Sequence, residues 1–256
     1  MSRPAKTGRE AEDFGGNGVI WHDVECGAYG ADLPLWEELT DQSGDRVLEL
    51  GAGTGRVALH LARRGRRVVA LERDAELLAE LRRRAEDERL EIETIEADAR
   101  SFSVAEPVAI VLAPMQLVQL LDRAGRSALL VAVAASLAPG GRAAIALLSE
   151  DGLPEAGEER PPLLPDVREV DDWVYSSLPV ALRRDNGEIE IRRLRQAVSP
   201  AGELSEKLDV TRLEAIDAGG LEAEARSHGL EPGGRREIPA TDDHSGSIAV
   251  LLRRAR

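Results

Sequence analysis

The chain contains very little of several residue types, and each shortage excludes a class of structure. Cys26 is the one cysteine in 256 residues, so an internal disulfide and a multi-cysteine zinc or iron–sulfur site are excluded. No apolar run approaches the roughly 18 residues that a membrane-spanning helix needs. The first ten residues lack the apolar segment of a secretory signal. We therefore expect a cytoplasmic protein with no bound metal and no membrane partner.

Lysine is almost absent as well. Lys6 and Lys207 are the two lysines among 33 basic residues, and 47 acidic residues give a formal net charge of −14. A nucleic-acid backbone requires a basic surface, so this acidity argues against nucleic acid as the main partner. The length favours one large domain, or one domain that carries an insertion. The sequence leaves the oligomeric state open between monomer and homodimer.

Short apolar strands alternate with helical patterns through the middle of the chain. Such alternation predicts βαβ units and a parallel sheet covered on both faces. After residue 216, a helix and two more strands follow. We expect a Rossmann-like, doubly wound, mostly parallel seven-stranded sheet in an α/β protein, with strands over 47–50, 67–71, 90–95, 108–112, 142–148, 230–238 and 247–252.

The segment between the last core strands has a different character. Residues 150–166 are rich in Pro, Glu and Gly and are typical of a loop. Two strand patterns then meet at Asp185-Asn186-Gly187, which is a strong signal for a tight hairpin. A third pattern follows at 203–213. Three successive strands without helices predict an antiparallel three-stranded insertion.

A glycine-rich segment carries the strongest chemical signal. Gly51, Gly53 and Gly55 lie between a predicted strand and a predicted helix. Glycines at such a turn let the backbone approach a ligand, and the helix N-terminus adds free N–H donors. Glu72 ends the next predicted strand, 21 residues after Gly51, where a carboxylate can accept both hydroxyls of a ribose. The spacing predicts a ribose-bearing ligand, although glycines can also serve packing alone and Glu72 could be a surface acid.

Glu49 indicates the charge of the ligand that the glycine segment would bind. The dinucleotide pattern G-x-G-x-x-G is absent, because the third glycine stands at Gly55 and not at the next position. A carboxylate two residues before Gly51 would repel a pyrophosphate, whereas it suits a cationic ammonium group. The combination favours a ligand with a ribose and a positively charged amino-acid part.

These motifs resemble the class I S-adenosylmethionine-dependent methyltransferases. The resemblance covers roughly residues 30–150 and rests on Val47-Leu48-Glu49-Leu50-Gly51-Ala52-Gly53-Thr54-Gly55-Arg56, Leu71-Glu72-Arg73-Asp74, Glu96-Ala97-Asp98-Ala99-Arg100-Ser101-Phe102 and Leu137-Ala138-Pro139-Gly140-Gly141. It implies S-adenosylmethionine as the cofactor. It also implies the following roles: Gly51, Ala52, Gly53 and Gly55 along the methionine portion, Glu49 at its ammonium, Glu72 at the ribose, Asp98 and Ala99 at the adenine edge, Arg73 and Phe102 over its faces, and Ala113, Pro114 and Met115 beside the sulfonium.

The methyl acceptor is not marked by any motif. Methyl transfer is an in-line displacement that needs no nucleophilic side chain, and a base helps only when the acceptor must lose a proton. His22, His244 and Gln116 are weak candidates for catalytic or acceptor contacts, and a structural role is the simpler interpretation of each histidine. The segment after the fourth strand lacks an Asn-Pro-Pro-Tyr-type motif, which disfavours methylation of base or glutamine amino groups.

The seven aromatic residues suggest where the acceptor sits. Residues 45–148 contain one of them, Phe102, and the others gather near the N-terminus and at 173–175. Tyr29 occupies a position from which related enzymes close over the methionine end, and its ring face could attract the sulfonium. Packing is an equal alternative for all of them. We list as candidate acceptor contacts Trp21, Trp36, Trp173 and Tyr175.

The sequence thus predicts a methyltransferase that acts on a small molecule. Alternatives are a non-catalytic S-adenosylmethionine-binding protein, a protein methyltransferase and an aminopropyl transferase on the same fold. The expected organisation is a flexible N-terminus (1–18), an N-terminal helical lid (19–42), a cofactor-binding core (43–149), a loop and antiparallel insertion on the acceptor side (150–215), and a last helix with two strands that complete the core sheet (216–256).

Overall fold

The structure, a computed structural model, describes residues 18–44, 46–148, 164–185, 187–241 and 246–255. Its helices are α1 (Gly18–Cys26), α2 (Leu33–Asp41), α3 (Arg56–Arg63), α4 (Ala75–Glu88), the 3₁₀ helix η1 (Leu117–Leu120), α5 (Arg123–Ser136) and α6 (Ala218–Arg226). Its strands are β1 (Arg46–Leu50), β2 (Arg67–Glu72), β3 (Ile92–Glu96), β4 (Val108–Ala113), β5 (Leu137–Leu148), β6 (Asp166–Val170), β7 (Trp173–Asp185), β8 (Glu188–Val198), β9 (Leu204–Glu214), β10 (Leu230–Ile238) and β11 (Ser247–Arg254).

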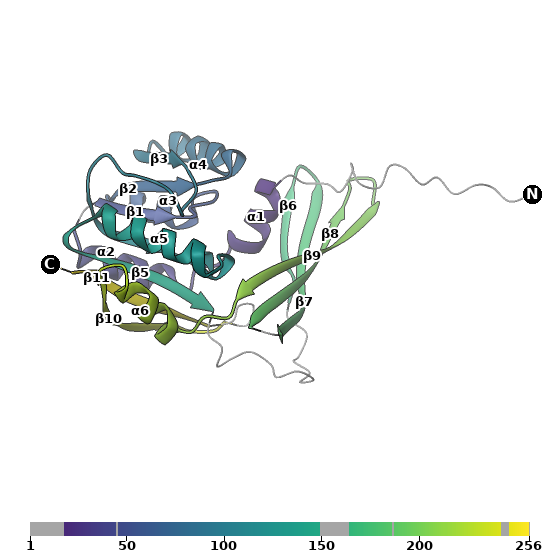
Figure 1. Cartoon of the computed structure of the whole chain (residues 1–256). Helices are drawn as coiled ribbons and strands as arrows, with labels where there is room; N and C mark the ends of the chain where they lie inside the picture. Colours follow the sequence, from purple (N-terminus) through teal and green to yellow (C-terminus); the bar gives the residue numbers. More distant parts are fainter. Residues whose placement is uncertain (1–17, 45, 149–163, 186, 242–245, 256) are drawn as a thin grey trace, which may run out of the picture.

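The larger sheet has seven strands in the order β10-β11-β5-β4-β1-β2-β3 (Figure 1). The five strands from β5 to β3 run parallel, while β11 pairs antiparallel with both β5 and β10. The predicted Rossmann-like, mostly parallel seven-stranded sheet is therefore confirmed. The order reverses between β1 and β4, and open α/β sheets bind ligands at the carboxyl ends of strands at such a switch point.

Helices cover both faces of this sheet, as its continuous apolar strands require. One face packs against α5 and α6, with Leu130 and Leu221 in the same cluster as Leu48 of β1. The other face packs against α2, α3 and α4, with Trp36 and Leu78 in contact with the cluster that includes Val47. Alternate residues of β1 thus serve opposite cores. Among the described residues, no helix is long and apolar enough to cross a membrane.

The insertion forms a second, antiparallel sheet in the order β6-β7-β8-β9. The sheet has one strand more than the three expected, because the prediction assigned no element to residues 167–172, where most of β6 lies. The turn that joins β6 to β7 uses Asp171 and Asp172 at φ 51° and 65°. Two residues with positive φ make the tight turn that a hairpin requires, and aspartate tolerates this conformation better than most residues do. The Asp-Asp pair is a weaker sequence signal than Asn-Gly.

β5 also differs from its prediction, because it begins at Leu137 and not at Arg142. The parallel register with β4 shifts, so that residues 138–141 of β5 lie opposite the single residue Ala109. Pro139-Gly140-Gly141 therefore lie in a bulge inside the strand. The helix before it ends at Ser136, and the chain passes into the strand without a separate loop.

Helix α1 lies between the two sheets (Figure 1). Its Trp21 and Val24 form an apolar cluster with Tyr175 and Ala197 of the insertion. Its neighbouring residues face the loop after β1, as described below. Successive positions of this short helix contact both sheets, so α1 joins the core to the insertion, together with an apolar cluster of Leu148, Ile189 and Leu213.

Candidate active site

The loop between β1 and α3 is built from glycines in a left-handed conformation. Gly51, Gly53 and Gly55 have φ of 66°, 54° and 97°, which residues with a Cβ rarely adopt. Space is short at all three as well, and a Cβ on Gly55 would lie 2.9 Å from the side chain of Leu81. A Cβ on Gly51 would lie 3.2 Å from the side chain of Leu117, and one on Gly53 would lie 2.2 Å from Nε2 of His22. The backbone of this loop is therefore closely covered by η1 and α1.

Glu72 lies at the end of β2 and binds the glycine loop directly. Its Oε2 accepts the N–H of Gly53 at 3.0 Å, and its Oε1 accepts the N–H groups of Arg73 and Asp74 at 2.9 and 3.0 Å. The side chain is buried. The structure thus brings the predicted ribose carboxylate against the predicted glycine loop, and three backbone amides fix its orientation.

The predicted adenine side lies next to Glu72 in the sheet. The carbonyl oxygen of Glu72 accepts the N–H of Ala97, so Asp98 and Ala99 follow the end of β3 at the same edge. Arg100 binds the Asp98 carboxylate through Nε, Nη2 and the backbone N–H at 2.9, 2.6 and 2.8 Å, and these contacts hold the pKa of Asp98 at about 2. Arg73 is exposed at this edge, and both Asp98 and Ala99 are half-buried. An ionised, partly accessible carboxylate can accept an N–H group there.

Glu49 is a buried carboxyl group in the middle of the core. It lies on the α3 side of β1, where its side chain is 3% exposed, and it accepts the backbone N–H of Ala58. Burial raises the pKa of Glu49 to about 8, against the opposing effect of the Arg56 guanidinium. Within the described chain, Oε2 of Glu49 has no hydrogen-bond partner. Such an oxygen is available to a donor that the ligand brings.

The segment after β4 places three further predicted residues near the loop. Ala113 is fully buried at the strand end, and Met115 has a φ of 57°, a strained conformation for a residue with a side chain. Gln116 is half-buried. Gln119, which the sequence did not indicate, is fully buried and accepts the N–H of Leu148 at 2.7 Å, while its Nε2 lacks a partner in the described structure.

His22 of α1 lies on the glycine loop. Its Nδ1 is 3.2 Å from Oγ1 of Thr54, and the Thr54 hydroxyl donates to Oδ1 of Asp23 at 2.7 Å. Burial lowers the pKa of His22, while Asp23 and Glu72 act against this effect. The candidate histidine of the sequence is therefore brought to the predicted cofactor loop.

Asp23 connects the loop to both halves of the molecule. Besides Thr54, its carboxylate binds Arg84 of α4 through two nitrogens and Arg168 of β6 at 2.9 Å. Burial alone would raise the pKa of Asp23, but hydrogen bonds from Arg84 and Thr54 hold it below its usual range. Asp23 is therefore an ionised group that ties α1 to the core and to the insertion.

Tyr29 and Trp36 take part in packing. The Tyr29 ring lies under the Arg56 guanidinium, 5.1 Å from its Cζ, and the Trp36 indole N–H donates to Asp32 at 2.8 Å. Asp32 also binds Arg56 through both oxygens at 2.5 and 2.7 Å. Trp36 is 0% exposed, so this conformation offers it no surface for an acceptor. For Trp36 the packing alternative holds.

The other aromatic candidates join α1 to the insertion. Trp21 meets Tyr175 edge to face at 5.5 Å, and Tyr175 stacks on Trp173 at 6.1 Å. Arg195 lies 5.4 Å from the Trp21 ring and binds Glu25 of α1 with two hydrogen bonds of 2.7 and 2.8 Å. These rings pack against one another between α1 and the insertion, and their contacts with an acceptor stay a prediction. His244 lies outside the described residues.

A family model described as "Methyltransferase domain" matches residues 47–141. This range contains the glycine loop, Glu72, Asp98 and the segment after β4. The fold around it is shared with crystal structures of S-adenosylmethionine-dependent methyltransferases. Residues 47–141 therefore match a methyltransferase domain, within a fold shared with S-adenosylmethionine-dependent methyltransferases.

Part of the chain is similar to curated proteins named ribosomal RNA small subunit methyltransferase A. The protein from Koribacter versatilis (strain Ellin345) is 34% identical over 116 residues, which are 45% of this chain and 36% of the relative. That from Anaeromyxobacter sp. (strain K) is 43% identical over 68 residues, 27% of this chain and 23% of the relative. The chain thus spans about a third or less of the length of these relatives.

Solved structures match a larger share of the chain at lower identity. A sugar N-methyltransferase from Streptoalloteichus sp. ATCC 53650 has a TM-score of 0.74 at 16% identity, with 100% of both chains covered. An amino pentose methyltransferase from Micromonospora echinaspora, bound to S-adenosylmethionine, has a TM-score of 0.71 at 20% identity and covers 94% of this chain and 98% of its own. These likenesses extend the shared fold beyond the methyltransferase domain to the insertion.

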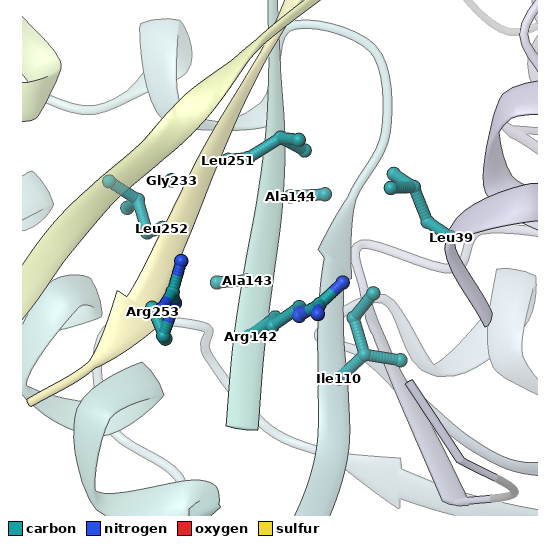
Figure 2. A pocket seen from close by; sticks show the side chains of 9 residues that line it. All are labelled: Leu39, Ile110, Arg142, Ala143, Ala144, Gly233, Leu251, Leu252 and Arg253. Carbon is teal, nitrogen blue, oxygen red and sulfur yellow. The ribbon is translucent and has the colours of Figure 1, made fainter. Parts of the chain in front are cut away.

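A small cavity lies beside the large sheet, towards the ends of β4 and β5 that face away from the glycine loop. It measures about 130 Å³ and is lined from α2, β4, β5, β10 and β11 (Figure 2). Ile110 and Arg142, near the start of the parallel part of β4 and β5, line it with Arg253. None of the residues predicted for the site lines this cavity, so it is separate from the candidate active site.

Proposed function

We propose that the protein transfers a methyl group from S-adenosylmethionine to a small-molecule acceptor. The observation that carries the proposal is the buried carboxyl group of Glu49, whose Oε2 has no partner in the described chain and which stands two residues before the glycine loop. A buried acid with a free oxygen suits a cationic donor, and the ammonium group of the methionine portion is one. A pyrophosphate would be repelled there.

The remaining residues of the site fit the other parts of this cofactor. At its three left-handed glycines the loop backbone carries no side chain, and Glu72 is already oriented against it. For the adenosine part, we propose that Glu72 binds a ribose hydroxyl, that Asp98 and the Ala99 N–H bind the adenine edge, and that Arg73 covers the adenine face. We propose that Ala113 and Met115 lie beside the sulfonium.

When bound, S-adenosylmethionine supplies a methyl group on a cationic sulfur. The chain contributes by holding the acceptor in line with that group, and such positioning can account for much of the rate without any nucleophilic side chain. The site lies at the carboxyl edge of the large sheet, and α1 with the inner face of the insertion stands over it (Figure 1). These two elements would bound the acceptor and limit the access of water.

A small molecule is favoured as the acceptor by two features. Structurally similar proteins include enzymes named for methylation of a sugar, an amino pentose and a glycopeptide. The net charge of −14 suits a cationic amine better than a polyanion. The structural likeness to these enzymes covers the insertion as well as the core. The insertion is the part of the chain that we expect to contact the acceptor.

Ribosomal RNA is the second candidate acceptor, because the curated relatives carry that activity in their names. Their identity to this chain is confined to 116 residues or fewer. More than half of this chain therefore has no counterpart in these matches, and the acidity of the chain argues against binding of the RNA backbone. A non-catalytic cofactor-binding role is a third possibility that only turnover can test.

Binding and turnover are tested in sequence. S-adenosylmethionine and its demethylated product should each raise the melting temperature, while NAD and ATP should not. No shift at saturating S-adenosylmethionine would refute the proposal. Release of the demethylated product is then measured with amino sugars, their nucleotide-linked forms and 16S rRNA as acceptors. Turnover with rRNA alone would favour the second candidate, and binding without turnover on any acceptor would favour the non-catalytic role.

A further inference from the structure

The Glu72 carboxylate has little capacity left for a ribose. An ionised carboxylate offers about four lone-pair positions. Backbone amides occupy three of them, two on Oε1 from Arg73 and Asp74 and one on Oε2 from Gly53. One position therefore remains, whereas a ribose presents two hydroxyl donors. The second hydroxyl needs a different acceptor close to Gly53.

His22 is held so that it presents an acceptor at that place. The Thr54 hydroxyl gives its one hydrogen to the ionised Asp23, so towards His22 it can only accept. The His22 nitrogen beside Thr54, Nδ1, must then carry a proton. Burial lowers the pKa of His22, which favours the neutral ring, and a neutral ring with Nδ1–H has a free lone pair on Nε2.

The free Nε2 lies against the residue that also binds Glu72. Nε2 is 2.2 Å from the position that a Cβ would occupy on Gly53, and the Gly53 N–H donates to Oε2 of Glu72. Two acceptors, one from α1 and one from β2, therefore flank the same glycine. Asp23 keeps the His22 side of this arrangement in place through its ion pairs with Arg84 and Arg168.

Resting on the proposed function, we propose that His22 is a second ribose-binding residue, whose Nε2 accepts the hydroxyl that Glu72 leaves without an acceptor. His22 is then a positioning residue for the cofactor and not a base for the methyl acceptor. The Asp23–Thr54–His22 chain selects the ring tautomer, and it links cofactor recognition to the insertion through Arg168.

The tautomer is tested first, on the protein without ligand. Long-range ¹H–¹⁵N NMR spectra of the ¹⁵N-histidine-labelled chain at pH 7.5 distinguish Nδ1–H, Nε2–H and doubly protonated rings, and the His22→Gln spectrum identifies the His22 signals. We expect the neutral Nδ1–H form, and its loss in Thr54→Val. A Nε2–H or a doubly protonated His22 in the unmodified protein would overturn the proposal.

Affinity for the demethylated cofactor, measured by calorimetry, tests the contact itself. His22→Phe should weaken binding about 3- to 10-fold, the range expected for one hydrogen bond, and His22→Gln should restore part of it by offering an amide oxygen. His228→Ala, a histidine that contacts Ser127 far from the loop, serves as the matched control and should bind normally.

Analogues of the demethylated cofactor that lack either the 2′- or the 3′-hydroxyl separate the possible outcomes. The effect of His22→Phe should disappear with one of the two analogues, because its hydrogen-bond donor is gone. An equal effect with the parent compound and both analogues would place His22 elsewhere and refute the inference. If the unmodified protein does not bind the parent compound, the proposed function itself fails, which is a distinguishable result.

Discussion

The two sheets of this molecule are stabilised in different ways. In the seven-stranded sheet, β1, β2 and β4 are buried along nearly their whole length and packed by helices on both faces. In the four-stranded sheet, one face turns to α1 and the other leaves large apolar side chains exposed, among them Val167, Leu204, Leu208 and Val210. The large sheet therefore depends on apolar burial on both faces. The small sheet is attached by its contacts with α1 and by a small apolar cluster in which Ile189 and Leu213 meet Leu148 of β5.

Those contacts with α1 are few and directional. Glu25 pairs with Arg195, Asp23 pairs with Arg168, and the Trp21 ring meets Tyr175. A burial-driven sheet tolerates the loss of any one polar contact, because its stability is spread over many residues. An attachment made by a few specific groups can be broken by single substitutions. Substitutions near α1 should therefore change the insertion and the cofactor loop without unfolding the core.

The largest loss of cofactor affinity is expected from a substitution of Glu72, which connects the glycine loop to β2 of the large sheet. Glu72→Ala removes the acceptor of three amides and the proposed partner of a ribose hydroxyl. Charge-assisted hydrogen bonds contribute roughly 1.5–3 kcal/mol each, so affinity for the demethylated cofactor should fall at least 100-fold. Calorimetry measures this, with circular dichroism to show that the sheet remains folded.

Glu96 provides the matched control for Glu72. It ends β3 in register with Glu72, and it is exposed. Glu96→Ala should leave cofactor affinity within about twofold of the unmodified protein, because an exposed acid contributes little. Equal losses for the two variants would mean that general negative charge at this edge, and not the Glu72 contacts, determines binding.

Removal of an aromatic ring that attaches the insertion to α1 should cause a clear loss of stability. Tyr175 is 4% exposed and touches both Trp21 and Trp173. Tyr175→Ala should lower the free energy of unfolding by about 3 kcal/mol, the lower end of values for a buried aromatic ring. Urea denaturation followed by tryptophan fluorescence measures the change, because Trp21 reports on this contact.

Val174 is the control for Tyr175, since it lies on the opposite, exposed face of the same strand. Val174→Ala should change stability by about 0.5 kcal/mol or less. If Tyr175→Ala is instead as stable as the unmodified protein and only raises KM for the acceptor, the ring lines an acceptor pocket and the packing interpretation is wrong.

A substitution of Asp23 should lower the free energy of unfolding by less, but it should loosen contacts in both the core and the insertion. Asp23→Ala leaves Arg84 and Arg168 without their shared carboxylate and Thr54 without its acceptor. Removal of one partner from a buried pair costs about 3–5 kcal/mol, but the two guanidinium groups retain some solvent, so about 2 kcal/mol is expected. Hydrogen exchange should show faster opening of both α1 and β6, while α5 remains protected.

Asp87→Ala provides the comparison for Asp23, because it breaks an exposed pair with Arg83 on α4. That variant should lose about 0.5 kcal/mol or less and change exchange only within α4. A loss of the same size and extent as for Asp23→Ala would mean that the joining role of α1 does not depend on its buried carboxylate.

The large sheet could be predicted from the sequence because its signals are local. The apolar run before Gly51 and the acid at Glu72 indicate a strand, a turn and a second strand without reference to the rest of the chain. Hydrophobic periodicity and glycine conformation are properties of neighbouring residues. The order of the strands then follows from the rules of parallel α/β sheets.

The attachment of the insertion could not be predicted in the same way. Asp23 and Arg168 are 145 positions apart and carry no local signal of their pairing. The role of Thr54 is also hidden, because its hydroxyl matters only once α1 has docked. β6 escaped prediction because its two-aspartate turn resembles a loop. Contacts that arise from the docking of separate elements are set by three-dimensional packing, which one sequence does not reveal.

The last test is a pH dependence of stability carried by Glu49 in the large sheet. Burial raises the pKa of Glu49 to about 8, compared with about 4.3 in an unfolded chain. The folded state therefore holds a proton that the unfolded state releases. This contribution to stability is present in full below the unfolded pKa and is lost as the pH rises through the folded pKa. Between those values the free energy of unfolding should fall by roughly 1.4 kcal/mol per pH unit.

Glu49→Gln removes this proton and should abolish that slope, so the variant should gain stability over the unmodified protein from pH 6 to pH 8 and no further above it. Denaturation curves at several pH values measure the difference. Addition of the demethylated cofactor sharpens the test, because an ammonium group beside Glu49 favours its ionised form. Binding at pH 7 should then release a proton in the unmodified protein and not in Glu49→Gln, which calorimetry in buffers of different ionisation enthalpy detects. Parallel pH profiles without ligand would refute the buried, protonated carboxyl group, whereas absent proton release alone would place the ammonium group away from Glu49.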